Sequence, residues 1–299
     1  MAFAPPGRLI RALGETAPEG DDWLARLPEI LQEALARREL GVERVQVPGG
    51  RSSLVVLVRY ADEFPAVLKL APPRARPEGE RAALAHWGGR GAVLPLPDEA
   101  GDGALLLERL HQDVSLRSLA EAKALLEAAG VLRRLWVEPP PGVTFETVGE
   151  RTGRQAAAMR ASAAADPALA PLVDAALDAR AGLLDGPPER RLLHGTFRQS
   201  KVLSAERMPW LAVGPDPVVG ECAFDLARLV RDRVEDLIGS PSGAAITRRR
   251  IKRLAESLEV DQERLRGWTL FRAVESGVRA LRVGRPGDAE LLLEFAGWL

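Results

Sequence analysis

The sequence predicts an α+β fold with two lobes, a β-rich N-terminal lobe over residues 1–110 and a mainly helical C-terminal lobe over residues 111–299. Strand-like apolar runs separated by turn residues concentrate in the first third of the chain. The remainder carries long segments in which apolar residues recur at the spacing of amphipathic helices. A chain of 299 residues is long enough for two such lobes.

The N-terminal lobe is expected to combine helices with a small group of strands. An acidic pair at residues 21–22 precedes a segment, 23–40, with apolar side chains at helical spacing. Two strand-like runs within residues 42–60 flank a turn at 48–50. The further elements expected are a strand over residues 63–70, a helix over 76–87 and a buried strand over 103–110.

The C-terminal lobe is expected to be helical, with a short β-like interruption. Helices are predicted over residues 116–136, 149–186 as one or two helices, 222–239, 242–258, 261–282 and 288–298. The interruption contains the β-like runs 191–193, 201–203 and 210–213.

Composition excludes several classes of function. The formal net charge is −1, which gives no field that would attract nucleic acid or an anionic membrane. Cys222 is the only cysteine, so disulfide frameworks and cysteine-based zinc sites are excluded. No apolar run approaches the roughly 20 residues that span a bilayer, and the first fifteen residues lack the apolar core of a secretory signal. We therefore expect a cytoplasmic protein, and the bias toward Arg, Ala, Gly and Pro suggests a bacterial genome of high GC content.

A basic cluster over residues 247–253 is interpreted as the solvated face of a helix. Ile251, Leu254 and Leu258 lie on one face of the same helix and would pack against the core. Nucleic-acid binding by this cluster is the alternative.

The turn between the first two strands contains candidate phosphate-binding residues, namely Gly49, Gly50, Ser52 and Ser53. Glycines in such a turn allow the backbone to approach a phosphate closely. The same residues also suit a plain hairpin turn, and the fragment by itself favours that interpretation.

Lys69 is unusual because it lies inside the apolar strand over residues 63–70. A buried ammonium group needs a partner, and Glu80 in the following helix is the expected one. The alternative is that Lys69 lies on an exposed edge of the sheet.

Eight stretches of the chain carry a resemblance to a known family. They read WLARLP, PGGRSSLVVLVR, AVLKL, ERAALAHWGGRGAV, GALLLERL, LLHG, VLSAERMPWLAV and FDLARLVRDR, in family order between about residues 22 and 235. The chain resembles the streptomycin 6-kinase and hydroxyurea phosphotransferase branch of the aminoglycoside phosphotransferases. The resemblance implies a protein-kinase-like fold, contact of Lys69 with the α and β phosphates of a nucleotide, and hinge positions at Glu108, Arg109 and Leu110 that receive adenine.

The resemblance also reveals three replacements in the catalytic motif. The family motif reads His-Gly-Asp, then four residues, then Asn, and a second Asp follows in a short hairpin. In this chain the motif runs from His194 to Lys201 with its spacing intact. Thr196 stands in place of the catalytic Asp, Lys201 in place of the magnesium-binding Asn, and Gly214 in place of the metal-binding Asp.

Each replacement removes a chemical capability. A threonine hydroxyl is not a carboxylate base, an ammonium group has no lone pair for a cation, and glycine has no side chain. Asp216, two residues beyond Gly214, would replace the lost metal ligand only if the hairpin shifted, and the prolines on either side oppose such a shift.

The residues around these positions are retained. His194, Gly195 and Asp225 match the family, in which this aspartate steadies the catalytic loop by hydrogen bonds; Trp210 is retained as well. His86 and His111 are interpreted as solvated or packing residues, and no cluster in the sequence has the spacing of a metal site.

The three replacements lead us to expect a pseudokinase that regulates or scaffolds by binding an unidentified protein partner or small molecule. A phosphotransferase acting on a hydroxyl of an aminoglycoside-like molecule and a metabolite-sequestering protein are the alternatives. A role in antibiotic resistance or secondary metabolism is what the family suggests. No magnesium-dependent phosphorylation of streptomycin-type acceptors is expected.

No cofactor is expected, and binding of ATP without magnesium is the alternative. Such an anion site would use Lys69, Arg198 and Lys201. In the competing interpretation, Lys201 folds back onto Asp216, Glu221 or Asp225 and blocks the nucleotide.

Overall fold

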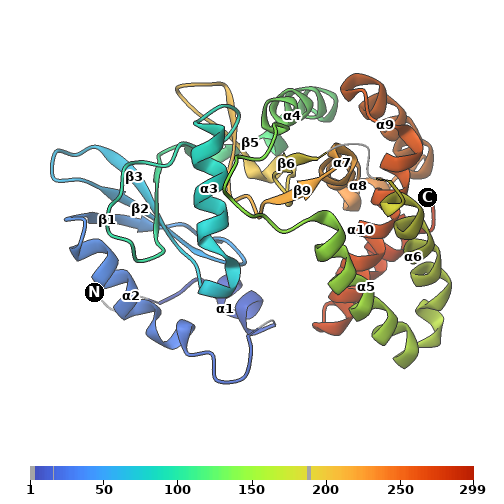
Figure 1. Ribbon diagram of the computed structural model, residues 1–299, viewed down its shortest axis with the longest axis horizontal. Coiled ribbons are helices and arrows are strands. Elements are labelled where there is room, and N and C mark those ends of the chain that lie inside the picture. Colours follow the sequence, from blue (N-terminus) through green and yellow to red (C-terminus); the bar gives the residue numbers. More distant parts are fainter. Residues whose placement is uncertain (1–3, 16, 187–189) are drawn as a thin grey trace. The chain divides into compact units, whose positions relative to one another are not determined.

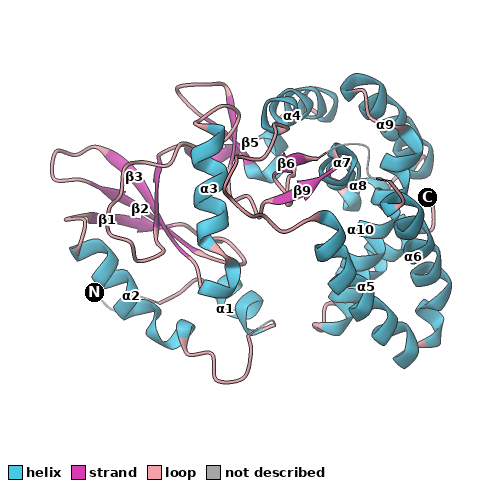
Figure 2. Cartoon of the chain, in the orientation of Figure 1, coloured by secondary structure: helices cyan, strands magenta, loops and turns pink. Residues whose placement is uncertain are grey.

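The computed structural model describes residues 4–15, 17–186 and 190–299, and it divides into two compact units. The first contains the chain up to Val114 together with Leu203–Asp216, and the second contains Ser115–Val202 and Pro217–Leu299. One unit combines a β-sheet with helices and the other is mainly helical, as the α+β prediction requires (Figure 2). Within the described residues, no helix combines the length and the apolar character needed to cross a membrane.

The first unit is built on a four-stranded antiparallel sheet with strand order β1-β2-β3-β4. Its elements are α1 (Gly7–Gly14), α2 (Trp23–Ala36), β1 (Gly41–Val45), β2 (Leu54–Arg59), β3 (Pro65–Leu70), α3 (Pro77–Trp87) and β4 (Leu105–Glu108). One apolar core joins α1 and α2 to alternate residues of the strands, including Leu9, Leu27, Val56 and Leu68. The elements expected from the sequence are all present, and their ends differ by a few residues.

Strand β3 is buried on both faces. Ala66, Leu68 and Leu70 belong to the core that α1 and α2 share with the sheet. Successive side chains of a strand point to opposite faces, so Val67 and Lys69 lie on the other face. Both are buried there as well, which means that Lys69 is not at an exposed edge.

The segment Leu203–Asp216 belongs to the first unit, although the boundary expected at residue 110 placed it with the second. It contributes β8 (Trp210–Ala212) and most of β7 (Val202–Ser204) to a sheet of order β5-β7-β8, in which β5 is His111–Ser115. The Arg207 guanidinium donates to the carbonyl of Gly89 at 2.6 Å and to Glu108 at 2.7 Å. These contacts join residues that lie far apart in the chain. A single boundary at one residue therefore could not separate the two units.

The second unit is a helical assembly around α10. It contains α4 (Glu121–Leu135), α5 (Val148–Ala165), α6 (Ala170–Leu184), α7 (Cys222–Val230), α8 (Val234–Ile238), α9 (Gly243–Leu258), α10 (Gln262–Arg282) and α11 (Pro286–Ala296), with β6 (Arg191–Leu193) paired to β9 (Val218–Gly220). Helix α10 packs against α5, α6, α7, α9 and α11 (Figure 1). Trp268 in α10 is fully buried and meets the rings of Phe224 and Phe271 edge to face.

The single helix expected over residues 222–239 is divided into α7 and α8. Arg233 interrupts it with a left-handed backbone conformation, φ 57°. Its guanidinium donates to the carbonyl of Leu119 at 2.9 Å and to the side-chain oxygen of Gln199 at 2.8 Å. Helical periodicity could not reveal this break, because tertiary hydrogen bonds compensate for the strained backbone.

Gly220 in β9 provides a test of this packing. An alanine Cβ at this position would lie 2.4 Å from Cγ2 of Val148 at the start of α5. We expect Gly220→Ala to lower the free energy of unfolding by about 1–3 kcal/mol, as overpacking does. Gly182→Ala is the control, because a Cβ in that part of α6 meets nothing within 4 Å. Urea denaturation should show a lower midpoint for the first variant only; equal midpoints would contradict a close approach of β9 to α5.

Candidate functional site

Lys69 and Glu80 form a buried ion pair between β3 and α3, as the sequence predicted. The side chains are only 11% and 7% exposed. The ammonium group donates to Oε2 of Glu80, while Oε1 of Glu80 is buried without a hydrogen-bond partner among the described residues. An ammonium group carries three donors. Glu80 is the one described residue with which Lys69 makes a side-chain hydrogen bond, so donors remain for a ligand.

The glycines of the β1–β2 turn are required by the turn itself. Gly49 has φ +74°, and a Cβ there would lie 2.9 Å from the carbonyl oxygen of Gln46. A Cβ on Gly50 would lie equally close, 2.9 Å, to the carbonyl oxygen of Ser53. Ser52 is exposed and Ser53 is buried. Backbone geometry thus explains both glycines, and contact with a phosphate stays a prediction.

The expected hinge residues after β4 have side chains that stabilise the first unit. Glu108 accepts from the backbone N–H of Leu94 at 2.8 Å and also pairs with Arg207. The Arg109 guanidinium donates to the carbonyls of Ala66, at 3.0 Å, and Val58, at 2.8 Å. Leu110 is buried. Adenine recognition at these positions stays a prediction.

In the second unit, Asp225 fixes the start of the loop 194–201. Its carboxylate accepts from the backbone N–H groups of His194 at 2.7 Å and Gly195 at 2.8 Å, the hydrogen bonds that the resemblance implied. Complete burial raises the pKa of Asp225, and the nearby Arg272 opposes that rise. Arg272 donates to the carbonyls of Gly195, at 2.7 Å, and Phe224, at 2.6 Å.

A second set of contacts fixes the end of the same loop. The backbone N–H of Gln199, a fully buried residue, donates to Asp232, and its side-chain oxygen accepts from Arg233. Arg250 donates to the carbonyls of Val230 and Asp232 at 2.6 and 2.9 Å. Periodicity in the sequence gave no indication of this second clamp.

The three replaced positions lie in different units. Thr196 and Lys201 belong to the second unit, where the Lys201 ammonium donates to Oγ1 of Thr196 at 2.6 Å. Gly214 belongs to the first unit and has φ +60°. Asp216, also in the first unit, pairs with Arg76 just before α3 at 3.2 Å.

The carboxylates considered as partners for Lys201 engage other groups. Asp216 binds Arg76, Asp225 accepts the two loop N–H groups, and Glu221 accepts from Arg264 at 2.6 Å. Whether Lys201 also pairs with one of these carboxylates stays an open alternative.

Arg198, the third candidate anion-binding cation, is half-buried and belongs to the second unit. Burial raises the pKa of Asp232, and the hydrogen bond from Gln199 and the charges of Arg117 and Arg198 oppose this rise. The charge of Arg198 therefore lies close to the clamp at Asp232.

The residues at the replaced positions do not fit a magnesium ion. Mg²⁺ prefers carboxylate and other oxygen ligands. Lys201 offers a positive charge, Gly214 offers no side chain, and Asp216 is engaged by Arg76. No cluster of three potential ligands from His, Cys, Asp and Glu occurs in the described part of the chain. His86 is half-buried, and His111 lies at the surface beside Glu206.

Sequence comparison identifies the family. Residues 38–284 match the family described as aminoglycoside/hydroxyurea antibiotic resistance kinase. This chain belongs to that family. It is 36% identical over 275 residues to streptomycin 6-kinase from Streptomyces glaucescens, covering 90% of this chain and 86% of the relative. It is 35% identical over 295 residues to hydroxyurea phosphotransferase from Kitasatospora aureofaciens, covering 93% and 82%.

Solved structures confirm the fold class of this family member. A thermostable mutant of aminoglycoside phosphotransferase APH(4)-Ia, in complex with ADP and hygromycin B, matches with a TM-score of 0.63. The match covers 89% of this chain and 96% of the other at 16% identity. At this identity the match shows the kinase-like fold alone.

The expectation of a non-catalytic pseudokinase, and with it that of a sequestering protein, is wrong. Relatives about 35% identical over most of this chain are named as phosphotransferases. Loss of activity was inferred from the residues at Thr196, Lys201 and Gly214 alone. Phosphoryl transfer, however, depends largely on the positioning of the reactants and on electrostatic stabilisation. The buried Lys69–Glu80 pair and the clamped loop are features of positioning and charge that the three replacements leave in place.

Removing one member of the buried pair should destabilise the first unit strongly. Lys69→Met leaves the Glu80 carboxylate buried and uncompensated, at a cost of about 3–5 kcal/mol in the free energy of unfolding. Lys69→Met combined with Glu80→Gln should recover part of that loss, because no buried charge remains.

The matched control is Lys252→Met. Lys252 pairs with Glu256 on the surface, where both side chains are 65% exposed, and should contribute less than about 1 kcal/mol. Chemical denaturation of the four proteins measures these differences. Equal stabilities of the Lys69 and Lys252 variants would refute a buried pair.

Proposed function

We propose that this chain is a small-molecule phosphotransferase that transfers phosphate from ATP to an alcohol group of an aminoglycoside-like acceptor. The buried Lys69–Glu80 pair carries the proposal. A buried ion pair seldom repays its desolvation by stability alone, so its presence favours a functional role. Membership of a family whose relatives are named as kinases of streptomycin and as a hydroxyurea phosphotransferase supports the same function.

Lys69 would bind the phosphates of the nucleotide. Glu80 holds the ammonium group at a fixed position on β3, and donors of that group remain for a second acceptor. A preorganised cation loses little freedom on binding, which increases its contribution to affinity. The short β1–β2 turn with Gly49 and Gly50 would supply backbone N–H groups to the same phosphates.

Thr196 and Lys201 would act on the acceptor and on the transferred phosphoryl group. The loop that carries them is fixed at one end by Asp225 and at the other by Asp232. The Thr196 hydroxyl would orient the acceptor alcohol by hydrogen bonding. As the bond from the alcohol oxygen to the γ-phosphorus forms and the bond to ADP breaks, the alcohol proton would pass to a phosphoryl oxygen or to water, because a loose transition state does not require a strong base. The Lys201 ammonium would stabilise charge on the phosphoryl oxygens.

Binding of ATP would not depend on magnesium. The donor set does not suit the metal, whereas Lys69 and Lys201 carry charges that phosphate groups prefer. The chain contains four lysines, and the proposal assigns the phosphates of the nucleotide to Lys69. We infer a cytoplasmic location in a bacterium, where ATP is available, and no protein partner is needed for the activity.

The proposal predicts ATP consumption that depends on an acceptor. Streptomycin and hydroxyurea are the probes, tested separately with ATP in magnesium and in EDTA, and phosphorylated product is measured by mass spectrometry. Lys69→Met combined with Glu80→Gln, in which no buried charge remains, should reduce the rate by about 100-fold or more, given the size of single electrostatic contributions to catalysis. Lys123→Met, an exposed change on α4, should leave the rate unchanged. No acceptor-dependent turnover by the wild-type protein in either buffer would end the proposal for these acceptors.

Lys201 should determine how the protein binds nucleotide without a metal. We expect calorimetry in EDTA to show ATP binding that Lys201→Met weakens about tenfold or more, since charged hydrogen bonds contribute roughly 1.5–3 kcal/mol. Lys201→Arg keeps the charge and should retain most of the affinity. Binding that appears only after magnesium is added, or that is the same in Lys201→Met, would show that Lys201 does not replace the metal.

A further inference from the structure

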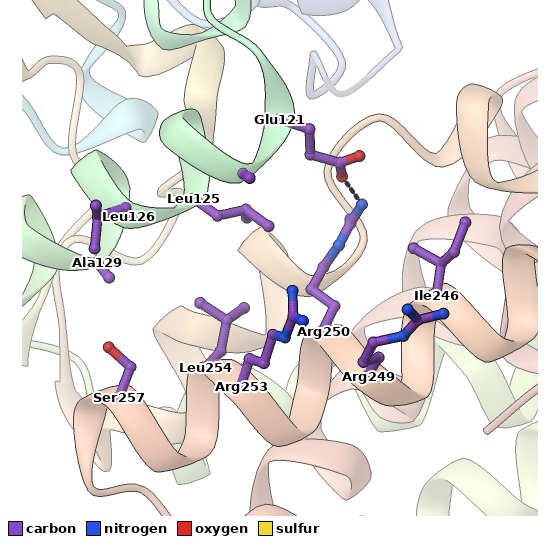
Figure 3. A pocket seen from close by; sticks show the side chains of 11 residues that line it. Glu121, Leu125, Leu126, Ala129, Ile246, Arg249, Arg250, Arg253, Leu254 and Ser257 are labelled. Atoms are coloured by element: carbon purple, nitrogen blue, oxygen red, sulfur yellow. Dashed lines mark hydrogen bonds and ion pairs between the residues drawn. The ribbon is translucent and has the colours of Figure 1, made fainter.

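A groove of about 350 Å³ lies between α4 and α9 in the second unit. Its apolar wall consists of Leu125, Leu126 and Ala129 from α4 and Ile246 and Leu254 from α9. Figure 3 shows these side chains on both sides of the groove, with three arginines of α9 beside them. The volume lies in the range of small-molecule sites.

Leu126 is the part of this wall that water contacts most. It is 69% exposed, although it is a large apolar side chain. A single exposed leucine is ordinary, but one that borders an apolar hollow adds to a continuous surface. A ligand with an apolar body would remove this surface from water, at roughly 25 cal/mol for each Å².

Of the arginines that line the groove, Arg250 is bonded to other residues, whereas Arg249 and Arg253 are available to a ligand. Arg250 is buried and bonded to Glu121 and to the carbonyls of Val230 and Asp232. Arg249 and Arg253 are exposed, and no hydrogen bond or ion pair to them is found within the described residues. They lie one turn apart on α9 and border the apolar wall (Figure 3).

We propose that this groove binds a small amphipathic organic anion, with an apolar body against the leucines and a carboxylate or phosphate group at Arg249 and Arg253. Charge complementarity decides the class of ligand, because the available charges beside the apolar wall are both positive. Guanidinium groups bind carboxylate and phosphate oxygens through paired hydrogen bonds. The site is separate from the residues of the proposed phosphotransferase function, and it does not depend on that function.

The probe is decanoate, which combines a flexible apolar chain with one carboxylate. Calorimetry on the full chain should show saturable binding. Decanamide, which has the same chain length and no charge, should bind about tenfold more weakly, since a charged hydrogen bond contributes roughly 1.5–3 kcal/mol. The double variant Arg249→Gln with Arg253→Gln should lower decanoate affinity by a similar factor and leave decanamide binding unchanged.

A matched variant removes two charges from another part of the same helix. Arg248 lines a different hollow, beside Trp298, and Lys252 pairs with Glu256. Arg248→Gln with Lys252→Gln therefore alters net charge equally and should change decanoate affinity less than about twofold, as expected for screened charges outside the site. Leu126→Glu adds a carboxylate at an exposed position of the wall and should weaken binding without loss of thermal stability.

Three results would overturn the proposal: no decanoate binding at about 1 mM, where even a weak specific complex would be detected; equal affinities for decanoate and decanamide; or equal effects of the two double variants. The last result would assign any binding to net charge instead of to the groove.

Discussion

The buried ammonium group of Lys69 is the constraint around which the first unit is organised. Strand β3 is covered on both faces, so a charge on it has little access to bulk water. Glu80 supplies the compensating charge from α3, and the sheet and the helix are thereby held in one relative position. The arrangement leaves hydrogen-bonding capacity on both partners, since Oε1 of Glu80 has no partner within the described residues. A purely structural pair would be expected to satisfy that oxygen.

The loop 194–201 shows how a retained scaffold can carry altered chemistry. Asp225 and Asp232 accept backbone N–H groups near its two ends, and Arg272 and Arg233 complete the network. None of these contacts uses the side chain of Thr196 or Lys201. Residues other than the replaced ones therefore hold both ends of the loop, and the replaced side chains are hydrogen-bonded to each other. For this reason, losing the usual catalytic groups does not imply losing the geometry that presents a substrate.

Arginine supplies much of the connection between distant segments. Arg207 and Arg109 bind backbone carbonyls in the first unit, and Arg250 and Arg272 do so in the second. A guanidinium group has five donors in a planar fork, so a single side chain can bind two carbonyl groups and a carboxylate. Arg250 illustrates the result, because it links Glu121 at the start of α4 to the backbone of Asp232, whose carboxylate holds Gln199. Arg249 and Arg253, next to it, make no such contact within the described segments.

The sequence by itself determined the fold class, nearly every helix and strand, and the partnership of Lys69 with Glu80. Periodicity reports which face of an element is buried, and a lysine in an apolar strand demands a nearby counter-charge. Motif spacing also located Thr196, Lys201 and Gly214, but three residues could not decide activity, because function depends on the whole site. The tertiary structure alone decided the break at Arg233, the place of Leu203–Asp216 in the first unit, and the clamp between Asp232 and Gln199. These features depend on hydrogen bonds between residues far apart in the chain, and such pairings leave no periodic pattern in the sequence.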